Sequence, residues 1–464
     1  MDEVLNHLLQ VAPLPIMARM LLERALNPAH IDELFERMAV RQYTHTVLFS
    51  DIVALLSTVT VRIHRSINVA YHKYKGDLKV SFVALYGKLK RIEPGVIAAL
   101  VNDNGVRMGE IITHLNAEFP PLVRGYHTRI VDGNALAATE HRLKPLRKTR
   151  SGALPGKSLV VLDHERDIIV DMLPCEDGHA QERSLFRQLI GLVHKGELWI
   201  ADRNFCTKWL LKNITTRGAE FLIRQHAKLR CTEVTKFALK GTGENGEQVF
   251  EQRVRIGFEE GAIIARRIMV VLKSTTRDGD RKIFLLTSLP AKIADALAVA
   301  EAYRKRWRLE TMFQNLTTTL RCEVEGLGNP RAALFAFAVA ILSANLLATI
   351  RAALRAAHGE DVEERLSTYA MVDDLQGTFR VVEYVAPSVE WNIFATMSLL
   401  EFIKFFLRCA KNVDLGRYPK APTRKRERKP KAGTPEDPPH VSTYQILRDQ
   451  RERQSAKIPM KRAA

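Results

Sequence analysis

Three carboxylates that stand far apart in the sequence have the setting that metal-dependent chemistry requires. Asp132 ends the apolar run RIVDGN, and Asp202 ends the apolar run LWIAD in the same manner. Carboxylates at the ends of strands in one sheet can converge on a point, and Mg2+ prefers oxygen ligands in a nearly octahedral array. Each aspartate taken alone is equally typical of an ordinary turn at the end of a strand.

The third carboxylate lies in the segment AYRKRWRLETMFQNL. Tyr303, Arg306 and Glu310 follow each other at the spacing i, i+3, i+7, which predicts that they share one face of a helix. We expect Glu310 to bind metal, Arg306 to contact a phosphate oxygen and Tyr303 to donate a hydrogen bond. The alternative is a charge ladder on the surface of an amphipathic helix.

Short strands must position the two aspartates. Apolar runs rich in Val, Ile and Leu, bounded by Gly, Asn or Asp, predict strands at RIVDGN, SLVVLD, DIIVDML and ELWIAD, and a crossover helix at HAQERSLFRQLIGLVHKG. A second group of strand-like runs, EVTKFAL, QVFEQRVRIGF, RRIMVVLK and KIFLLTSL, is separated by turn material and predicts a separate β-rich insert. The fold class is therefore α/β, with helical regions before and after the strands.

These changes of texture give five predicted segments. They are a helical region whose basic patches could grip DNA (1–125), a region of strands with the crossover helix (126–228), the β-rich insertion (229–290), a second helical region that contains Glu310 (291–413), and a basic tail (414–464). The tail is rich in Pro and charge, so we expect it to be largely disordered.

The composition predicts a polyanionic partner. The 464 residues carry 70 Lys and Arg against 52 Asp and Glu, a formal net charge of +18 and a pI of about 9.7. Such a charge favours nucleic acid or an anionic membrane surface. The five cysteines stand singly, which favours neither a disulfide framework nor a zinc knuckle, and no secretory signal is visible at the N-terminus.

One uncharged segment, 332–350, nearly reaches the length of about 20 residues that spans a bilayer. It is rich in Ala, contains Ser343, Asn345 and Thr349, and has no companion span. We therefore predict a buried helix and no membrane partner.

The segments DGN, ADRNF and YRKRWRLETMF resemble the insertion-sequence transposases that carry a Tyr-Arg-Glu-Lys signature, the family called insertion sequence four, within the DDE transposases. Tyr303, Arg306 and Glu310 match the first three signature positions. Thr317 stands where the family has Lys. The resemblance covers about residues 128–350, and the predicted β-rich stretch lies between the second and third acids, as in the family.

The resemblance implies a ribonuclease-H-like core in which Asp132, Asp202 and Glu310 are catalytic and bind two Mg2+ ions, with Mn2+ as a substitute. It also implies cut-and-paste transposition by a homodimer acting on terminal inverted repeats and target DNA. Water and then a 3′ hydroxyl would attack DNA phosphodiesters in line. We expect a prokaryotic, cytoplasmic, nucleoid-associated protein.

Thr317 cannot offer a positive charge to a phosphate. Arg321 lies one helical turn further along the predicted helix, so we expect it to take the role of the missing Lys in binding DNA. Trp307, next to the signature, is a candidate for stacking on a DNA base, although such a residue more often packs in a core.

Cations without neighbouring acids follow the first aspartate in HRLKPLRKTR. These basic side chains could hold DNA phosphates in position. The alternative is that they belong to a solvated loop without a binding role. The predicted DNA-binding residues here are Arg142, Lys144, Arg147, Lys148 and Arg150.

Two other functions remain open: a nuclease of the same fold that only hydrolyses DNA, and a catalytically silent DNA-binding relative. Thr317, which stands where the family has Lys, is the feature that favours the catalytically silent relative. Strand-transfer products distinguish a transposase from a nuclease, and metal-dependent nicking distinguishes both from the silent relative.

Overall fold

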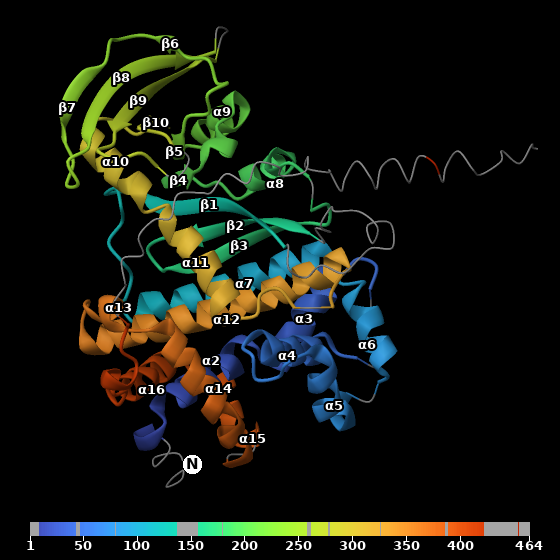
Figure 1. The fold of residues 1–464 in the computed structure, drawn as a ribbon. Helices are drawn as coiled ribbons and strands as arrows, with labels where there is room; N and C mark the ends of the chain where they lie inside the picture. Colours follow the sequence, from blue (N-terminus) through green and yellow to red (C-terminus); the bar gives the residue numbers. More distant parts are fainter. Residues whose placement is uncertain are drawn as a thin grey trace, which may run out of the picture.

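The centre of the molecule is a ten-stranded sheet (Figure 1). In this computed structural model the described residues are 9–42, 47–78, 80–136, 156–178, 180–257, 261–276, 279–324, 326–385, 388–421 and 453. The first strands form an antiparallel meander, after which two strands run parallel to β1. They are β1 (His127–Ala135), β2 (Lys157–Asp163), β3 (Ile168–Cys175), β4 (Glu197–Ala201) and β5 (Glu220–Arg224), in the spatial order β3-β2-β1-β4-β5.

The strands that we expected to form a separate β-rich insert instead extend this sheet. The edge of β5 pairs antiparallel with β10, and β9, β8 and β6 follow, with β7 paired to β8. Unpaired backbone groups on an edge strand are a ready template for another strand, and β10 takes that place. The five strands that extend the sheet are β6 (Thr232–Glu233), β7 (Ala238–Thr242), β8 (Gln248–Ile256), β9 (Ile263–Val271) and β10 (Lys282–Thr287).

Both faces of the first five strands are covered, because successive apolar side chains point to opposite sides. Ile130 of β1 packs toward the large helical layer, which includes α7 (Pro94–His114) and α12 (Pro330–His358). Val131 packs toward a smaller layer that contains the short helices between the strands. Those helices are η2 (Glu182–Leu185), α8 (Phe186–Gly191), η3 (Arg203–Phe205) and α9 (Lys208–Thr216).

Helices from both ends of the chain share one core around α12 (Figure 1). Helix α2 packs against α12, α14, α15 and α16, so the predicted helical region 1–125 is packed into the C-terminal helices. The N-terminal helices are α2 (Pro13–Ala25), α3 (Pro28–Met38), α4 (Phe49–Thr60), α5 (Ile67–Leu78) and α6 (Phe82–Leu89). The C-terminal ones are α13 (Val362–Arg365), α14 (Thr368–Val385), α15 (Ser388–Thr396), α16 (Leu399–Lys411) and η4 (Leu415–Arg417).

Helix α12 contains the uncharged segment and is the one described helix that is long and apolar enough to cross a membrane. Its most apolar window has a mean hydropathy of 2.2, and 89% of that window is buried inside the protein. The structure therefore places this segment as a core helix, as its Ser, Asn and Thr content predicted.

A buried amide fixes α12 to the sheet. The side chain of Asn345 accepts a hydrogen bond from the Ile169 backbone N–H (2.9 Å) and donates to the Ile169 carbonyl (2.8 Å). It also donates to the Asn104 side chain on α7 (3.0 Å), and both asparagines are buried. Since buried polar groups need partners, this network sets the position of both helices against β3.

We predict that Asn345→Leu lowers the free energy of unfolding by about 2–4 kcal/mol, because it leaves the Ile169 backbone groups and Asn104 without partners. Urea unfolding followed by circular dichroism measures the change. Asn412→Ala, at an exposed position after α16, is the control and should shift stability by no more than about 0.5 kcal/mol. Equal stability of the two variants would contradict the structural role of Asn345.

Candidate active site

The parallel pairing of β1 and β4 brings the two aspartates together. In the register of this pair Val131 lies opposite Ala201, so Asp132, inside β1, and Asp202, directly after the last residue of β4, occupy adjacent positions. Because β1 continues to Ala135 by pairing with β2, the expectation that Asp132 ends its strand is wrong. Neighbouring strands lie about 4.8 Å apart. Asp202 has an extended backbone and caps η3 by accepting a hydrogen bond from the Asn204 N–H at 2.8 Å. The two carboxylates predicted from strand-end positions are therefore neighbours.

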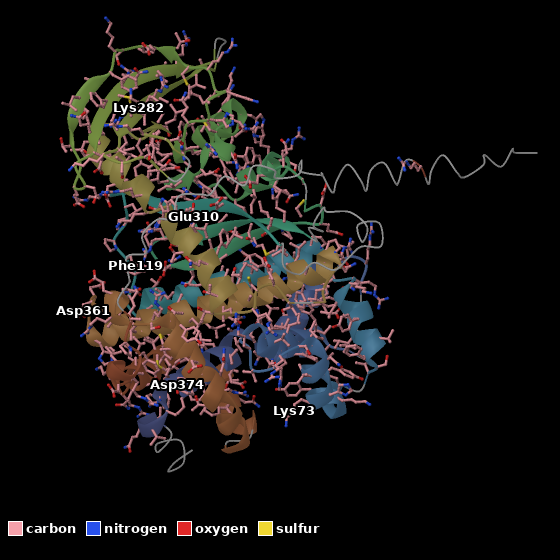
Figure 2. The ribbon with its side chains drawn as sticks, in the orientation of Figure 1. Lys73, Phe119, Lys282, Glu310, Asp361 and Asp374 are labelled. Atoms are coloured by element: carbon pink, nitrogen blue, oxygen red, sulfur yellow. The ribbon has the colours of Figure 1, made fainter. Side chains whose placement is uncertain are left out.

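Arg306 connects Asp132 to the third carboxylate. Its guanidinium donates to Asp132 Oδ2 at 3.1 Å and to Glu310 Oε1 at 2.5 Å, and its side chain is only 11% exposed. Glu310 lies on α11 (Trp307–Thr318), which contacts β1 (Figure 2). Thus the structure places Asp132, Asp202 and Glu310 in one site, with Arg306 between the first and the last.

The signature residues do not lie on one uninterrupted helix, as the spacing predicted. Helix α10 (Ala296–Arg304) ends one residue after Tyr303, and Lys305 and Arg306 form a turn before α11 begins. Both turn residues keep right-handed helical backbone angles, so the chain direction is nearly maintained. The interruption places Arg306 at the N-terminus of α11, from which it reaches the carboxylates on both sides.

The electrostatics of the site are those of crowded negative charge. Burial raises the pKa of Asp132 to about 7; the guanidinium of Arg306 opposes this rise, and the carboxylates of Asp202 and Glu182 add to it. Burial also raises the pKa of Tyr303 to about 12. Tyr303 therefore remains a neutral hydroxyl at pH 7, next to a carboxyl that titrates near that pH.

Glu182 is a member of the site that the sequence analysis missed. Its carboxylate packs against Gly133, where an added Cβ would lie 2.3 Å from Glu182 Oε1, and it is 3.8 Å from Lys157 Nζ. Burial and the charge of Asp202 raise the pKa of this carboxyl. One sequence signal could have identified Glu182. It is an acid at the start of the predicted crossover helix, where the chain returns toward β4.

The side chains of Asp132, Asp202, Glu310 and Glu182 all offer carboxylate oxygens. These are the ligands that a hard divalent cation prefers. Burial is the main cause of the raised pKa of Asp132, and the charges of Asp202 and Glu182 add to it; a bound cation would favour the ionised form. Among the described residues, however, no three His, Cys, Asp or Glu side chains already converge as metal ligands. The guanidinium of Arg306 lies between Asp132 and Glu310, and it supplies the positive charge there.

The structure places the other predicted DNA-binding residues differently. Helix α11 ends at Thr318, so the expectation that Arg321 continues the same helix is wrong; its guanidinium donates to the Arg65 carbonyl. The hydroxyl of Thr317, at the signature Lys position, bonds to the Phe313 carbonyl within the helix at 3.0 Å. The basic loop residues Arg142, Lys144, Arg147, Lys148 and Arg150 lie outside the described residues.

Trp307, the candidate for base stacking, is 62% exposed and therefore is not a core residue. The guanidinium of Arg306 lies 5.8 Å from the centre of its ring. An exposed ring beside the carboxylate site is available to contact a substrate.

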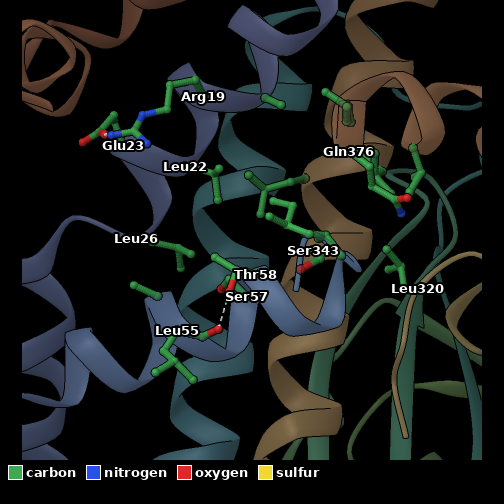
Figure 3. A pocket seen from close by; sticks show the side chains of 18 of the residues that line it. Arg19, Leu22, Glu23, Leu26, Leu55, Ser57, Thr58, Leu320, Ser343 and Gln376 are labelled. Atoms are coloured by element: carbon green, nitrogen blue, oxygen red, sulfur yellow. Dashed lines mark hydrogen bonds and ion pairs between the residues drawn. The ribbon is translucent and has the colours of Figure 1, made fainter. Parts of the chain in front are cut away.

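A separate cavity of about 430 Å³ lies among the helices and lacks the features of a catalytic site (Figure 3). Leucines are the most frequent residues in its walls, which also contain the Arg19–Glu23 ion pair. Hydroxyls in its lining donate to helix carbonyls, Ser57 to Val53 and Thr58 to Leu55. Those polar groups are thus already satisfied.

The raised pKa of Asp132 predicts a pH-dependent cost to stability in metal-free protein. Because the folded pKa (about 7) exceeds the unfolded value near 4, the cost is absent below about pH 4, grows as the pH rises to 7 and is constant above that. We expect Asp132→Asn to be about 2–4 kcal/mol more stable than wild type at pH 8 in EDTA, and this difference to shrink at pH 5. Urea unfolding at a series of pH values measures it.

The control is Asp373→Asn, which changes an exposed carboxylate on α14 and should leave the pH dependence as in wild type. A stability difference between Asp132→Asn and wild type that does not vary between pH 5 and pH 8 would refute the assignment.

Comparison with known proteins gives one family match and a distant structural likeness. Residues 124–346 match the family described as "Transposase DDE domain". No curated protein matches the chain. Among solved structures, the piggyBac transposase, described as a synaptic complex with hairpin DNA, is similar over 82% of this chain and 84% of that chain, with 13% identity and a TM-score of 0.41.

The matched segment contains Asp132, Asp202 and Glu310, together with β1–β10, α10 and α11. It makes up just under half of the 464 residues. The match supports the assignment of residues 124–346 to the transposase DDE domain family.

Proposed function

We propose that this protein is a DNA transposase that cuts transposon ends and joins them to target DNA, with Asp132, Asp202 and Glu310 as its catalytic carboxylates. The observation that carries the proposal is that Arg306 bridges Asp132 of β1 and Glu310 of α11, while Asp202, at the end of β4, lies beside Asp132 in the strand register. The transposase DDE domain match over the same residues agrees with it.

We infer a ribonuclease-H-like core of the kind that the insertion-sequence-four class contains. The order β3-β2-β1-β4-β5 supports this inference, because three antiparallel strands are followed by two strands parallel to β1. The Tyr303, Arg306 and Glu310 set supports the finer class, and Thr317 in place of Lys is a departure from it.

The proposed cofactor is Mg2+, with Mn2+ as a substitute, held by Asp132, Asp202 and Glu310. Bound divalent ions would stabilise the attacking and leaving oxygens of phosphoryl transfer. Glu182 is close enough to raise the pKa of Asp132, so it adds to the negative potential that attracts a cation.

The residues of the chain have separate tasks in this proposal. Arg306 leaves its carboxylate partners and binds an oxygen of the scissile phosphate, for which its planar fork of donors is well suited. Tyr303, neutral because burial raises its pKa to about 12, orients Arg306 by packing near its guanidinium, at 5.9 Å from the ring centre. The water or 3′ hydroxyl that attacks comes from solvent or DNA, so no covalent protein intermediate is required.

The proposed partners are the terminal inverted repeats, target DNA and a second copy of the chain in the synaptic complex. The net charge of +18 supports a DNA partner. The alternative, a nuclease of the same fold, uses the same carboxylates but produces no joined DNA. A catalytically silent relative would bind DNA and not nick it.

We predict that Asp132→Asn, Asp202→Asn and Glu310→Gln each reduce metal-dependent cleavage by about three orders of magnitude or more, because each removes a metal ligand. The substrate is a supercoiled plasmid that carries the DNA flanking the coding region on both sides. Binding to the same DNA in EDTA should persist in all three variants.

Three outcomes of that assay would decide against the proposal. Wild-type cleavage by any one variant disqualifies that residue as a catalytic carboxylate. Nicking by wild-type protein without any joined product identifies a nuclease, and metal-independent binding without nicking identifies the silent relative.

We also predict that Arg306→Gln separates metal binding from catalysis. Removal of a cation from between Asp132 and Glu310 should tighten Ca2+ binding several-fold in DNA-free protein, measured by calorimetry. The same change should slow cleavage by about 100-fold or more, since a guanidinium on the phosphate is lost.

Arg281→Gln is the matched control, because Arg281 is an exposed arginine ahead of β10. It should change neither Ca2+ affinity nor cleavage. Weaker Ca2+ binding by Arg306→Gln would show that the arginine orders the carboxylates and does not compete with the metal.

A further inference from the structure

A groove lies along the flank of α11 that is turned away from Asp132. It has a volume of about 560 Å³, within the range of about 300–1,000 Å³ that small-molecule pockets show. One wall is α11, beginning at Trp307, and the opposite side is formed by the start of α14 and by Lys420. Neither Arg306 nor Glu310 lines it, so the groove is distinct from the carboxylate site.

Two exposed aromatic rings line this groove. Trp307 is 62% exposed, and Tyr369, near the start of α14, is 65% exposed. Trp307 also lies next to Arg306, so its ring connects the groove with the carboxylate site.

The lining of the groove is predominantly cationic. It contains five cations, Arg304, Lys305, Arg308, Arg351 and Lys420, against two acids, Asp167 and Glu363.

The acids are already engaged with part of this set. Asp167 pairs with Arg308 at 3.6 Å, and Glu363 pairs with Arg351 and Arg355. Arg304 pairs with Glu247 and Glu301, and Lys305 pairs with Glu301. Lys420 is exposed and makes no ion pair among the described residues.

Two arginines stack on one ring beside the groove. Arg308, which lines the groove, lies over the ring of Phe119 at 4.3 Å, and Arg355, which does not, lies over it at 3.9 Å. Burial and the charge of Arg308 lower the pKa of the nearby His164 to about 4, so this histidine adds no charge of its own at pH 7.

We propose that this groove binds an unpaired DNA segment, with bases stacked on Trp307 and Tyr369 and phosphates held by the cations. Exposed rings combined with a positive groove are how proteins bind single strands without reading their sequence. The small concave volume suits one or two nucleotides and is too small for a duplex. This inference rests on the proposed function, and it assigns to α11 a second task beside carrying Glu310.

The test is the affinity of the full-length protein for a fluorescent oligothymidylate, measured by anisotropy in EDTA so that cleavage plays no part. Tyr369→Ala and Trp307→Ala should each weaken binding by about 5- to 100-fold, the range expected for one stacked base. Tyr369→Phe and Trp307→Phe keep a ring and should restore most of the affinity. Lys420→Ala should weaken binding and reduce its dependence on salt.

Two control variants match these changes in residue type and exposure. Trp209→Ala removes a tryptophan on α9 that is 46% exposed, and Lys411→Ala removes an exposed lysine at the end of α16. Both lie outside the groove and should leave affinity within about twofold of wild type.

Three results would overturn the proposal: unchanged affinity in Tyr369→Ala, equal binding of an abasic strand and the oligothymidylate, or an equal loss of duplex binding in the groove variants. The second would show that only phosphates are bound, and the third that the surface holds duplex. A failure of the proposed function is distinguishable, since wild-type protein would then bind the oligothymidylate but show no metal-dependent cleavage of DNA.

Discussion

The ion bridge from Asp132 through Arg306 to Glu310 is the interaction on which the candidate site depends. It joins β1 to α11, two elements separated by more than 170 positions in the chain. Without a positive charge at this point, the partly buried carboxylates of Asp132, Asp202 and Glu310 would repel one another. Burial raises the pKa of Asp132 to about 7 even though the charge of Arg306 opposes the rise.

This partial compensation suits a site that exchanges partners. The guanidinium of Arg306 pairs with Asp132 and Glu310, and no ion pair joins it to Asp202 among the described residues, so in the proposed function the charge of Asp202 is available to a cation. The break between α10 and α11 contributes to the same property, because it places Arg306 at a turn and not within a rigid helix. Gly133 makes room for Glu182 beside the aspartates, so the absence of a side chain is itself part of the site.

The rest of the fold holds these groups in place. The parallel register of β1 and β4 aligns the two aspartates, and the Asn345 network fixes α12 and α7 beneath the sheet. Helix α11 contacts both β1 and α12, so its position depends on the core from both sides. One flank of α11 then carries Glu310, and the other lines the cationic groove that contains Trp307.

The sequence by itself singled out the three carboxylates as candidates and determined the first four strands and the buried character of α12. Short apolar runs with turn residues at their ends are local signals, and so is the spacing of Tyr303, Arg306 and Glu310. The same local signals failed where the outcome depended on partners distant in the chain. The β-rich stretch joins the edge of β5, and neither β5 nor the membership of Glu182 was anticipated.

Only the tertiary structure decided which charges meet. Sequence spacing placed Arg306 beside Glu310, but its contact with Asp132 arises from the packing of α11 on β1. It also decided that α11 ends at Thr318, which moves Arg321 away to the Arg65 carbonyl, and that Trp307 and Tyr369 line one groove. The physical reason is that ion pairing, burial and pKa depend on distances through space, which a chain specifies only after its hydrophobic faces have packed.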